Sequence, residues 1–361
     1  MTADSPVRDT VPQRFASPKS SRGRVRVSEA WTGRRRGRGR RKPAPLLAAI
    51  DLGTNNCRLL IARSERGALR VVDAFSRIVR LGEGVAQNGL LSDAAIDRTI
   101  EALKICSQRI RARNVRRVRA VGTEACRRAA NVEALVSRAR DEAGIALEVI
   151  SAAEEARLAA LGCAPLIDPD ARGGLIFDIG GGSTEIIWMQ WREGGAPEVI
   201  ASTSEPAGVV TLSEQWGGHS LDRSGYSRLR EAMIARFAAA KAAMDAIEVF
   251  DPATHHLLGT SGTVTTLAGV ALGLARYDRG RVDASWHRCG DILAVIDRLV
   301  DFDWKGRAAV GCVGPDRADL IVPGCAVFAA IASLWPCARL RVADRGLREG
   351  MLRELAMEAG Q

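Results

Sequence analysis

Three glycine-containing turns carry the residues of this sequence that are best suited to chemistry. They are Asp51–Asn56, Asp178–Glu185 and Gly259–Thr263. Glycine lets backbone N–H groups turn toward an anion because no Cβ blocks the approach. One such turn is usually an ordinary hairpin, but three in this order, two of them opened by an aspartate, indicate phosphate binding. The predicted phosphate contacts are Gly53, Thr54, Asn55, Gly180, Gly181, Gly182, Ser183, Thr184, Gly262 and Thr263.

The aspartates that open two of these turns, Asp51 and Asp178, point to a metal. A carboxylate beside a bound phosphate is repelled unless a cation lies between them. We therefore expect both aspartates to hold a hard divalent ion, most simply Mg²⁺ bound partly through water. The alternative for each aspartate is a turn-capping role without a metal.

The elements around the turns alternate between strand and helix patterns. Apolar runs at Leu46–Asp51 and Cys57–Arg63 predict the order strand, turn, strand. Leu175–Asp178 and Glu185–Gln190 repeat that order around the second turn, which indicates two related lobes. Strands that alternate with helices place both lobes in the α/β class.

Apolar residues at helical spacing predict several helices and help to set the domain boundaries. Ala125–Ala143, Glu154–Cys163 and 265–274 are expected as helices. The predicted domains are a basic tail at 1–44, a first lobe at 45–170 and a second lobe at 171–361. The helix expected at Gly346–Glu358 could pack back on the first lobe.

The formal net charge of +10 belongs to the predicted tail. Residues 1–45 contain 13 Lys and Arg against 3 Asp and Glu, so the rest of the chain is neutral. We expect the tail to be disordered because its apolar residues are too sparse to form a core. Its Arg34–Lys42 run can bind RNA or another polyanion through charge alone. A solvated tail with only non-specific affinity is the alternative.

Composition also excludes some classes of protein. No apolar run approaches the roughly 18 residues of a membrane helix, and no apolar stretch follows the Arg-rich N-terminus as it would in a secretory signal. These observations predict a cytoplasmic protein without membrane contact. The eight cysteines show no spacing typical of zinc sites, so we expect buried, reduced thiols.

The order of four motifs resembles the exopolyphosphatase and guanosine pentaphosphate phosphohydrolase family, which belongs to the actin, Hsp70 and sugar-kinase superfamily. The motifs are DLGTNNCRLLIA from Asp51, EEARLAALG from Glu154, DIGGGSTE from Asp178 and GTSGT from Gly259. The resemblance extends from around residue 46 to residue 356. It implies two actin-like, ribonuclease H-like lobes across a cleft, in the short two-domain form of the family. It also implies a homodimer, because members of the family often form dimers.

The same resemblance assigns roles to further residues. Glu155 and Glu185 match the two acidic catalytic positions, where they would orient and activate the attacking water. Positioning is what phosphoryl transfer through a loose transition state requires. Arg58, Arg127 and Arg317 match candidate phosphate contacts, and guanidinium groups suit phosphate oxygens. Structural or surface ion pairing is the alternative for each arginine.

The implied reaction is the removal of the terminal phosphate from inorganic polyphosphate, the conversion of pppGpp to ppGpp, or both. Nothing in the sequence separates these substrates. One alternative is an ATPase or kinase of the same superfamily, although no sugar-kinase acceptor motif is recognisable and no residues are left for the peptide-binding domain of an Hsp70-type chaperone. Another is a non-catalytic polyphosphate or alarmone sensor, although both acidic positions are present.

Overall fold

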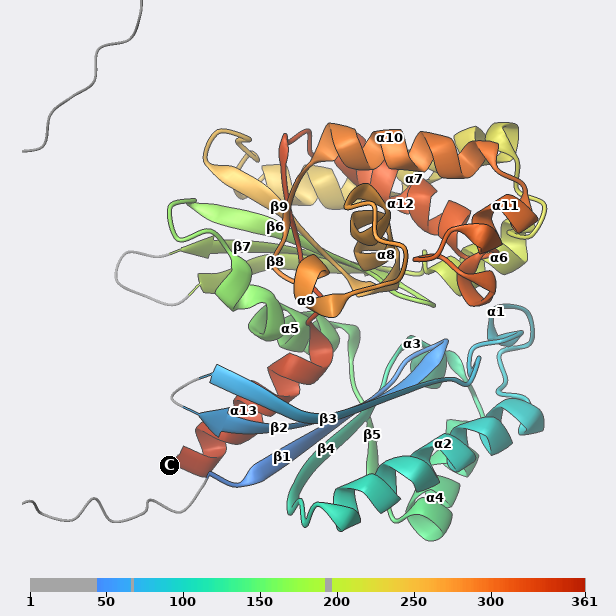
Figure 1. The fold of residues 1–361 in the computed structure, drawn as a ribbon, viewed down its shortest axis with the longest axis vertical. Helices are drawn as coiled ribbons and strands as arrows, with labels where there is room; N and C mark the ends of the chain where they lie inside the picture. Colours follow the sequence, from blue (N-terminus) through green and yellow to red (C-terminus); the bar gives the residue numbers. More distant parts are fainter. Residues whose placement is uncertain (1–43, 66–67, 192–196, 361) are drawn as a thin grey trace, which may run out of the picture. The chain divides into compact units, whose positions relative to one another are not determined.

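The computed structural model describes residues 44–65, 68–191 and 197–360. These residues form two β-sheets with helices packed on them (Figure 1). The predicted basic tail and its RNA contact lie outside the described residues, apart from Ala44. None of the described helices is both long and apolar enough to cross a membrane.

The first sheet has five strands in the order β3-β2-β1-β4-β5. Its first three strands form an antiparallel meander, and β4 and β5 extend the sheet from β1 in parallel. The central strand β1 is apolar almost throughout because both of its faces are covered. The strands are β1 (Leu46–Leu52), β2 (Asn56–Glu65), β3 (Ala68–Ile78), β4 (Arg117–Gly122) and β5 (Leu147–Val149).

The second sheet repeats this plan and has the order β10-β11-β9-β6-β7-β8. Strands β6, β7 and β8 form the meander, and β9 and β11 follow β6 in parallel. The repeat confirms the predicted fold class, an α/β protein with two ribonuclease H-like lobes. The strands are β6 (Gly173–Ile179), β7 (Thr184–Trp191), β8 (Pro197–Glu205), β9 (His255–Thr260), β10 (Trp286–Arg288) and β11 (Arg339–Val342).

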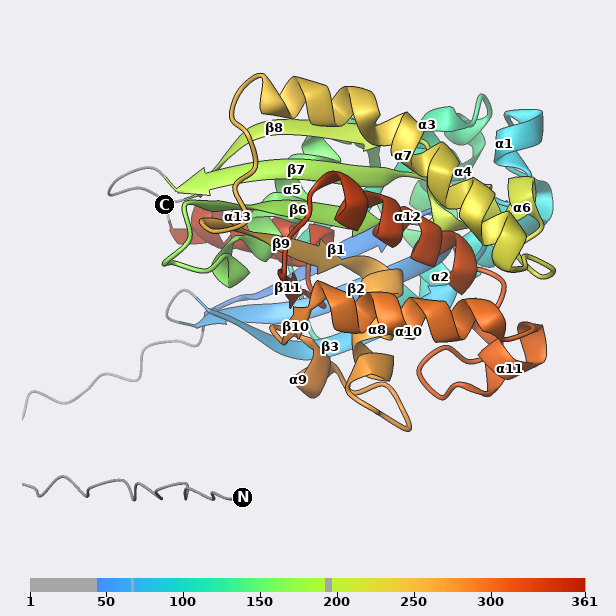
Figure 2. The ribbon, with the colours of Figure 1, turned by 90° about the horizontal axis from the view of Figure 1, so that it is seen from above.

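Long helices cover the outer faces of the sheets. On the first sheet, α2 (Asp93–Ala112) and α4 (Val132–Ala143) bury apolar side chains against the strands. On the second sheet, α7 (Arg223–Asp245), α10 (Cys289–Asp301) and α12 (Ile321–Leu334) do the same (Figure 2). The other helices are α1 (Val85–Asn88), α3 (Glu124–Arg128), α5 (Ala152–Cys163), α6 (Val209–Trp216), α8 (Ser261–Ala271), α9 (Arg279–Val282), α11 (Trp304–Ala309) and α13 (Leu347–Gly360).

Helices α5 and α13 lie between the two sheets (Figure 1). Met351 of α13 belongs to the same apolar cluster as Leu60 of the first sheet, whereas Ala159 of α5 belongs to the same cluster as Ile187 of the second. The two helices contact each other closely where Gly350 meets the backbone of Leu158. The described fold therefore places α5 against the second sheet and α13 against the first.

One predicted helix differs from the structure, and the third glycine turn differs in form from the other two. The helix predicted over Ala125–Ala143 is divided into α3 and α4, because the side chain of Asn131 both donates to and accepts from the backbone of Leu91, each at 2.9 Å. The third glycine turn is not a hairpin. It is the junction at which β9 ends and α8 begins, with Ser261 in a left-handed conformation at φ 76°.

Candidate active site

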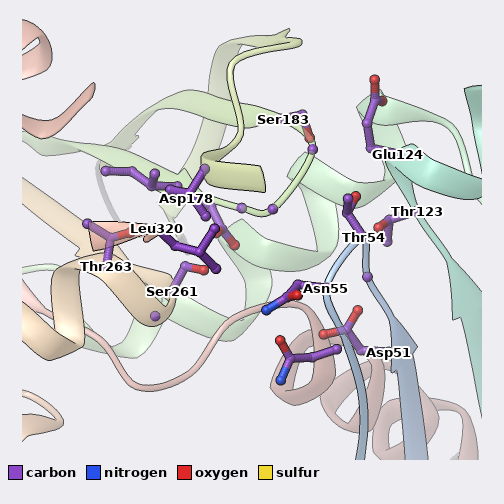
Figure 3. Close-up of a pocket in the computed structure, with 18 of the residues that line it drawn as sticks. Asp51, Thr54, Asn55, Thr123, Glu124, Asp178, Ser183, Ser261, Thr263 and Leu320 are labelled. Carbon is purple, nitrogen blue, oxygen red and sulfur yellow. The ribbon is translucent and has the colours of Figure 1, made fainter. Parts of the chain in front are cut away.

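Both hairpins that carry the predicted phosphate turns line one cavity (Figure 3). The hairpin β1–β2 contributes Asp51 and Thr54, and the hairpin β6–β7 contributes Asp178 and Ser183. The first turn of α8 adds Thr263 from the third predicted turn. The structure thus brings the three turns together although more than 200 residues separate the first from the last.

The turns of the two hairpins approach each other so closely that position 182 requires glycine. A Cβ on Gly182 would lie 2.5 Å from Oγ1 of Thr54 and 2.9 Å from Cγ of Glu124. Atoms of ordinary side chains do not approach each other to such distances. The absence of a side chain at this position therefore lets the two lobes meet over the cavity.

The backbone of the two turns is held by its carbonyl groups. Asn55 O accepts a hydrogen bond from Val79 N–H at 2.9 Å, and Gly181 O accepts one from Val210 N–H at 2.8 Å. Within the described chain, the backbone N–H groups of Asn55 and Gly181 have no hydrogen-bond acceptor. The turns are therefore fixed in place while N–H donors at the cavity stay available to an anion.

The two hairpins carry different charges at corresponding positions. Asp51 is paired with Arg58 across β1 and β2, and Asp178 is paired with Glu185 across β6 and β7. Each partner lies seven residues after its aspartate. The repeated architecture thus places a cation beside one aspartate and a further carboxylate beside the other.

The two glutamates predicted to be catalytic are held by different partners. Glu155 lies in the first turn of α5, and its Oε2 accepts a 2.6 Å hydrogen bond from Arg127. Glu185 is buried, and its Oε1 accepts hydrogen bonds from the hydroxyls of Ser183 (2.6 Å) and Ser204 (2.8 Å). Both carboxylates are thus oriented before any ligand binds.

Burial and mutual repulsion raise the pKa values of these carboxylates. Burial, reinforced by the charge of Asp178, raises the pKa of Glu185 to about 7. Burial and the charge of Glu185 hold the pKa of Glu155 well above its ordinary value, although Arg127 opposes the shift. Burial, opposed by the charge of Arg58, raises the pKa of Asp178 to about 6. The ionised forms of these three carboxylates are therefore unfavourable in the folded protein, and a bound cation would stabilise them.

Asp51 and Asp178 together fit a hard divalent cation. Burial raises the pKa of Asp51 as well, and the cation nearest to it is the guanidinium of Arg58 at 3.9 Å. Among the described residues no group of three or more His, Cys, Asp or Glu forms a complete metal cage. Two carboxylates with water and phosphate oxygens are a coordination set typical of magnesium-like ions.

A sequence model of the Ppx/GppA phosphatase family matches residues 60–359. This chain belongs to the Ppx/GppA phosphatase family. The predicted family and the predicted class of enzyme, a phosphohydrolase, are thereby confirmed.

Individual relatives agree with this membership. The chain is 35% identical over 296 residues to Exopolyphosphatase 2 of Mycobacterium tuberculosis, covering 79% of this chain and 89% of the relative. It is 30% identical to the guanosine-5'-triphosphate,3'-diphosphate pyrophosphatase of Aeromonas hydrophila, and the alignment spans 86% of this chain but only 59% of that longer protein. The crystal structure of the Aquifex aeolicus Ppx/GppA family member superposes with a TM-score of 0.73 at 30% identity, covering 88% of this chain and 100% of that structure.

Most of the predicted site residues of this Ppx/GppA phosphatase line the cavity. Those that do are Asp51, Gly53, Thr54, Asn55, Arg58, Glu155, Asp178, Gly180, Gly181, Gly182, Ser183, Gly262, Thr263 and Arg317.

Three predicted residues are absent from that lining: Arg127, Thr184 and Glu185. The hydroxyl of Thr184 donates to the carbonyl of Ala207, so it supports the second turn from behind. Glu185 lies behind Ser183, to which it is hydrogen-bonded, and Arg127 contacts Glu155.

Sequence reasoning missed Glu124, which lines the cavity. Its Oε2 accepts hydrogen bonds from Nε and Nη2 of Arg127, at 3.2 and 2.8 Å. Arg127 therefore bridges Glu124 and Glu155. Glu124 lies three residues before the predicted Arg127, but only the fold shows that α3 directs this glutamate into the site.

The raised pKa of Glu185 leads to a prediction about stability. Its pKa rises from an ordinary 4.5 to about 7 on folding, so the ionised carboxylate destabilises the fold above pH 7 by about 3 kcal/mol, and this penalty disappears as the pH falls toward 4.5. We expect Glu185→Gln, measured in EDTA by thermal unfolding, to raise Tm at pH 8 and to lose that advantage at pH 5. An equal change in Tm at both pH values would contradict the assignment.

Proposed function

We propose that this Ppx/GppA phosphatase removes the terminal phosphate of inorganic polyphosphate, converts pppGpp to ppGpp, or does both. The observation that carries the proposal is the meeting of two phosphate turns with the carboxylates of Asp51, Glu155 and Asp178 in one cavity. The named activities of the relatives from Mycobacterium tuberculosis and Aeromonas hydrophila support these two substrate classes.

The proposed mechanism uses the two turns to bind and the two glutamates to direct water. The free N–H groups of Asn55 and Gly181, together with the hydroxyl of Thr54, would hold the phosphate oxygens. Glu155, which lines the cavity, would orient a water molecule in line with the bond to be broken and accept its proton, and Glu185 would help to position that water through the hydroxyl of Ser183. The water oxygen then bonds to the terminal phosphorus, and the bond between that phosphorus and the bridging oxygen breaks. The shortened chain leaves with the bridging oxygen, and the water oxygen stays in the released phosphate.

Mg²⁺ is the proposed cofactor, with Asp51 and Asp178 as its protein ligands. When bound, the ion would neutralise charge on the phosphate oxygens and on the carboxylate cluster. The raised pKa values of both aspartates support this role, because the ionised pair is unfavourable without a cation.

Removal of divalent cations is therefore expected to stop the reaction. EDTA should lower phosphate release by about 10²-fold or more, and added Mg²⁺ should restore it. Asp178→Asn should stay slow at every Mg²⁺ concentration, because the substitution removes a ligand charge. Full activity in EDTA after dialysis would contradict the metal assignment.

The substrate is tested by measuring phosphate release with Mg²⁺ from long-chain polyphosphate, pppGpp and ATP in parallel. Release from either of the first two supports the proposal, and the faster of them identifies the preferred substrate. Release from ATP alone would favour an ATPase or kinase of the superfamily. Tight binding of polyphosphate or pppGpp without any release would favour a sensor.

The cytoplasm is the proposed location. All eight cysteines are unpaired and seven of them are buried, which suits a reducing compartment. The homodimer and the contact with RNA stay predictions from the sequence.

A further inference from the structure

A second cavity continues from the first beyond the proposed metal ligands. Arg58 and Arg317 line both cavities, so they stand where the two spaces join. The far part of the second cavity is lined by Tyr277, Arg345 and Arg348, and none of these three lines the first. A linear ligand whose end lies near Glu155 can therefore extend past the two shared arginines.

Two of the arginines in the second cavity make no ion pair with a described residue, and a third makes only a long one. The carboxylate nearest to Arg58 is Asp51, at 3.9 Å. Arg317 donates to the hydroxyl of Thr266 at 2.7 Å and has no ion pair within the described chain. Arg348, at the start of α13, makes no hydrogen bond or ion pair to any described residue. Asp51 and Asp178, the proposed metal ligands, also line this cavity, so Arg317 and Arg348 are its guanidinium groups without a paired carboxylate in the described chain.

The acidic residues at this end are already occupied. Asp344 accepts a hydrogen bond from Tyr277 at 2.5 Å and pairs with Arg279 at 3.4 Å. Arg345 in turn pairs with Asp283. Of the charged side chains that line the far part, Arg348 is the one that makes no ion pair with a described residue, and its charge lowers the pKa of Asp51.

The positive charges of Arg58 and Arg317, where the two cavities meet, repel each other. Burial and the neighbouring charge of Arg58 both lower the pKa of Arg317. An anion between the two guanidinium groups would relieve this repulsion. Leu347 is the one aliphatic side chain in the lining, whereas hydroxyls such as those of Ser76 and Ser261 add polar contacts. The lining suits phosphate groups better than a nucleobase.

We infer that the second cavity is a subsite for phosphate groups farther along the substrate chain, with Arg348 as a specificity-determining contact. This inference rests on the proposed function. It favours linear polyphosphate over pppGpp, because only a longer phosphate chain fills both cavities.

The test measures binding in a Glu155→Gln background, which keeps the probes intact. The probes are long-chain polyphosphate and tripolyphosphate, titrated with Mg²⁺ at one salt concentration. Adding Arg348→Gln is expected to weaken binding of the long chain about tenfold, as for the loss of one charged hydrogen bond, and binding of tripolyphosphate by less. Arg348→Lys, which keeps the charge, should recover part of the loss.

Arg288→Gln in the same background is the matched control. Arg288 is exposed and lines neither cavity, but its substitution removes the same charge. It should leave the ratio of the two dissociation constants unchanged. An unchanged ratio for Arg348→Gln, with the thermal unfolding curve intact, would overturn the subsite.

Two results separate this inference from the proposed function. Phosphate release by the unmodified protein tests hydrolysis, whereas the ratio of dissociation constants tests the subsite even if no hydrolysis occurs. If Arg348→Gln lowers kcat equally for polyphosphate and tripolyphosphate and leaves both dissociation constants unchanged, the second cavity is the path by which released phosphate leaves the site. That result would also overturn the inference.

Discussion

Glu155→Gln is expected to lower kcat for phosphate release by about 10²- to 10⁴-fold, the range typical for loss of a positioned acid–base group. The substitution keeps the size of the side chain and an oxygen that can accept the hydrogen bond from Arg127, but it removes the charge that would hold the water and take its proton. KM should change little, since Glu155 contacts the water rather than the phosphate chain. Initial rates of phosphate release over a range of substrate concentrations separate the two parameters.

The neighbouring Glu154 provides a matched control for Glu155. Its carboxylate pairs with Arg157 at 2.7 Å and with Arg119 at 3.0 Å, and it does not line the cavity. Glu154→Gln should therefore leave kcat within a few-fold of the unmodified protein, although it can lower Tm. Equal losses in the two variants would mean that the helix, rather than the Glu155 carboxylate, determines the rate.

Gly350→Ala is expected to destabilise the protein by about 3 kcal/mol or more, because it over-packs the crossing of α5 and α13. A Cβ at this position would lie 1.9 Å from the carbonyl oxygen of Leu158, and a backbone atom cannot move aside without separating the helices. Because α5 also carries Glu155, phosphate release should fall together with stability. Chemical denaturation gives the change in the free energy of unfolding.

Gly290→Ala is the control for the effect of the added methyl group itself. Gly290 lies in α10, and a Cβ there would meet no atom within 4 Å. Alanine favours a helix over glycine by about 1 kcal/mol, so this variant should be neutral or slightly more stable. If both variants change stability by the same amount, close packing at Gly350 is not the cause.

Local patterns were sufficient to predict the α/β class and the turns that line the cavity, whereas Glu155, Arg58 and Arg317 were assigned from the resemblance to the family. The apolar runs around Asp51 and Asp178 predicted two hairpins, and these hairpins meet at one cavity. Glycine spacing predicted the phosphate turns because only a residue without a Cβ lets another chain segment or an anion come close to the backbone. Gly182 is an example, since a Cβ there would overlap Thr54.

Contacts between distant segments could not be read from local patterns. The break between α3 and α4 depends on Asn131, whose partner Leu91 lies 40 residues away. The pairing of Arg127 with both Glu124 and Glu155 depends on how α3 and α5 are brought together. Periodicity reports which face of an element is buried, but it does not report which side chain lies opposite.

The most direct test of the central claim is hydrolysis of polyphosphate in ¹⁸O-labelled water, followed by mass spectrometry of both products. Attack of water on the terminal phosphorus predicts one ¹⁸O atom in each released inorganic phosphate and none in the shortened chain. If pppGpp is the preferred substrate, the label should likewise appear in phosphate and not in ppGpp. Label in the shortened chain, or release of pyrophosphate instead of phosphate, would contradict the account.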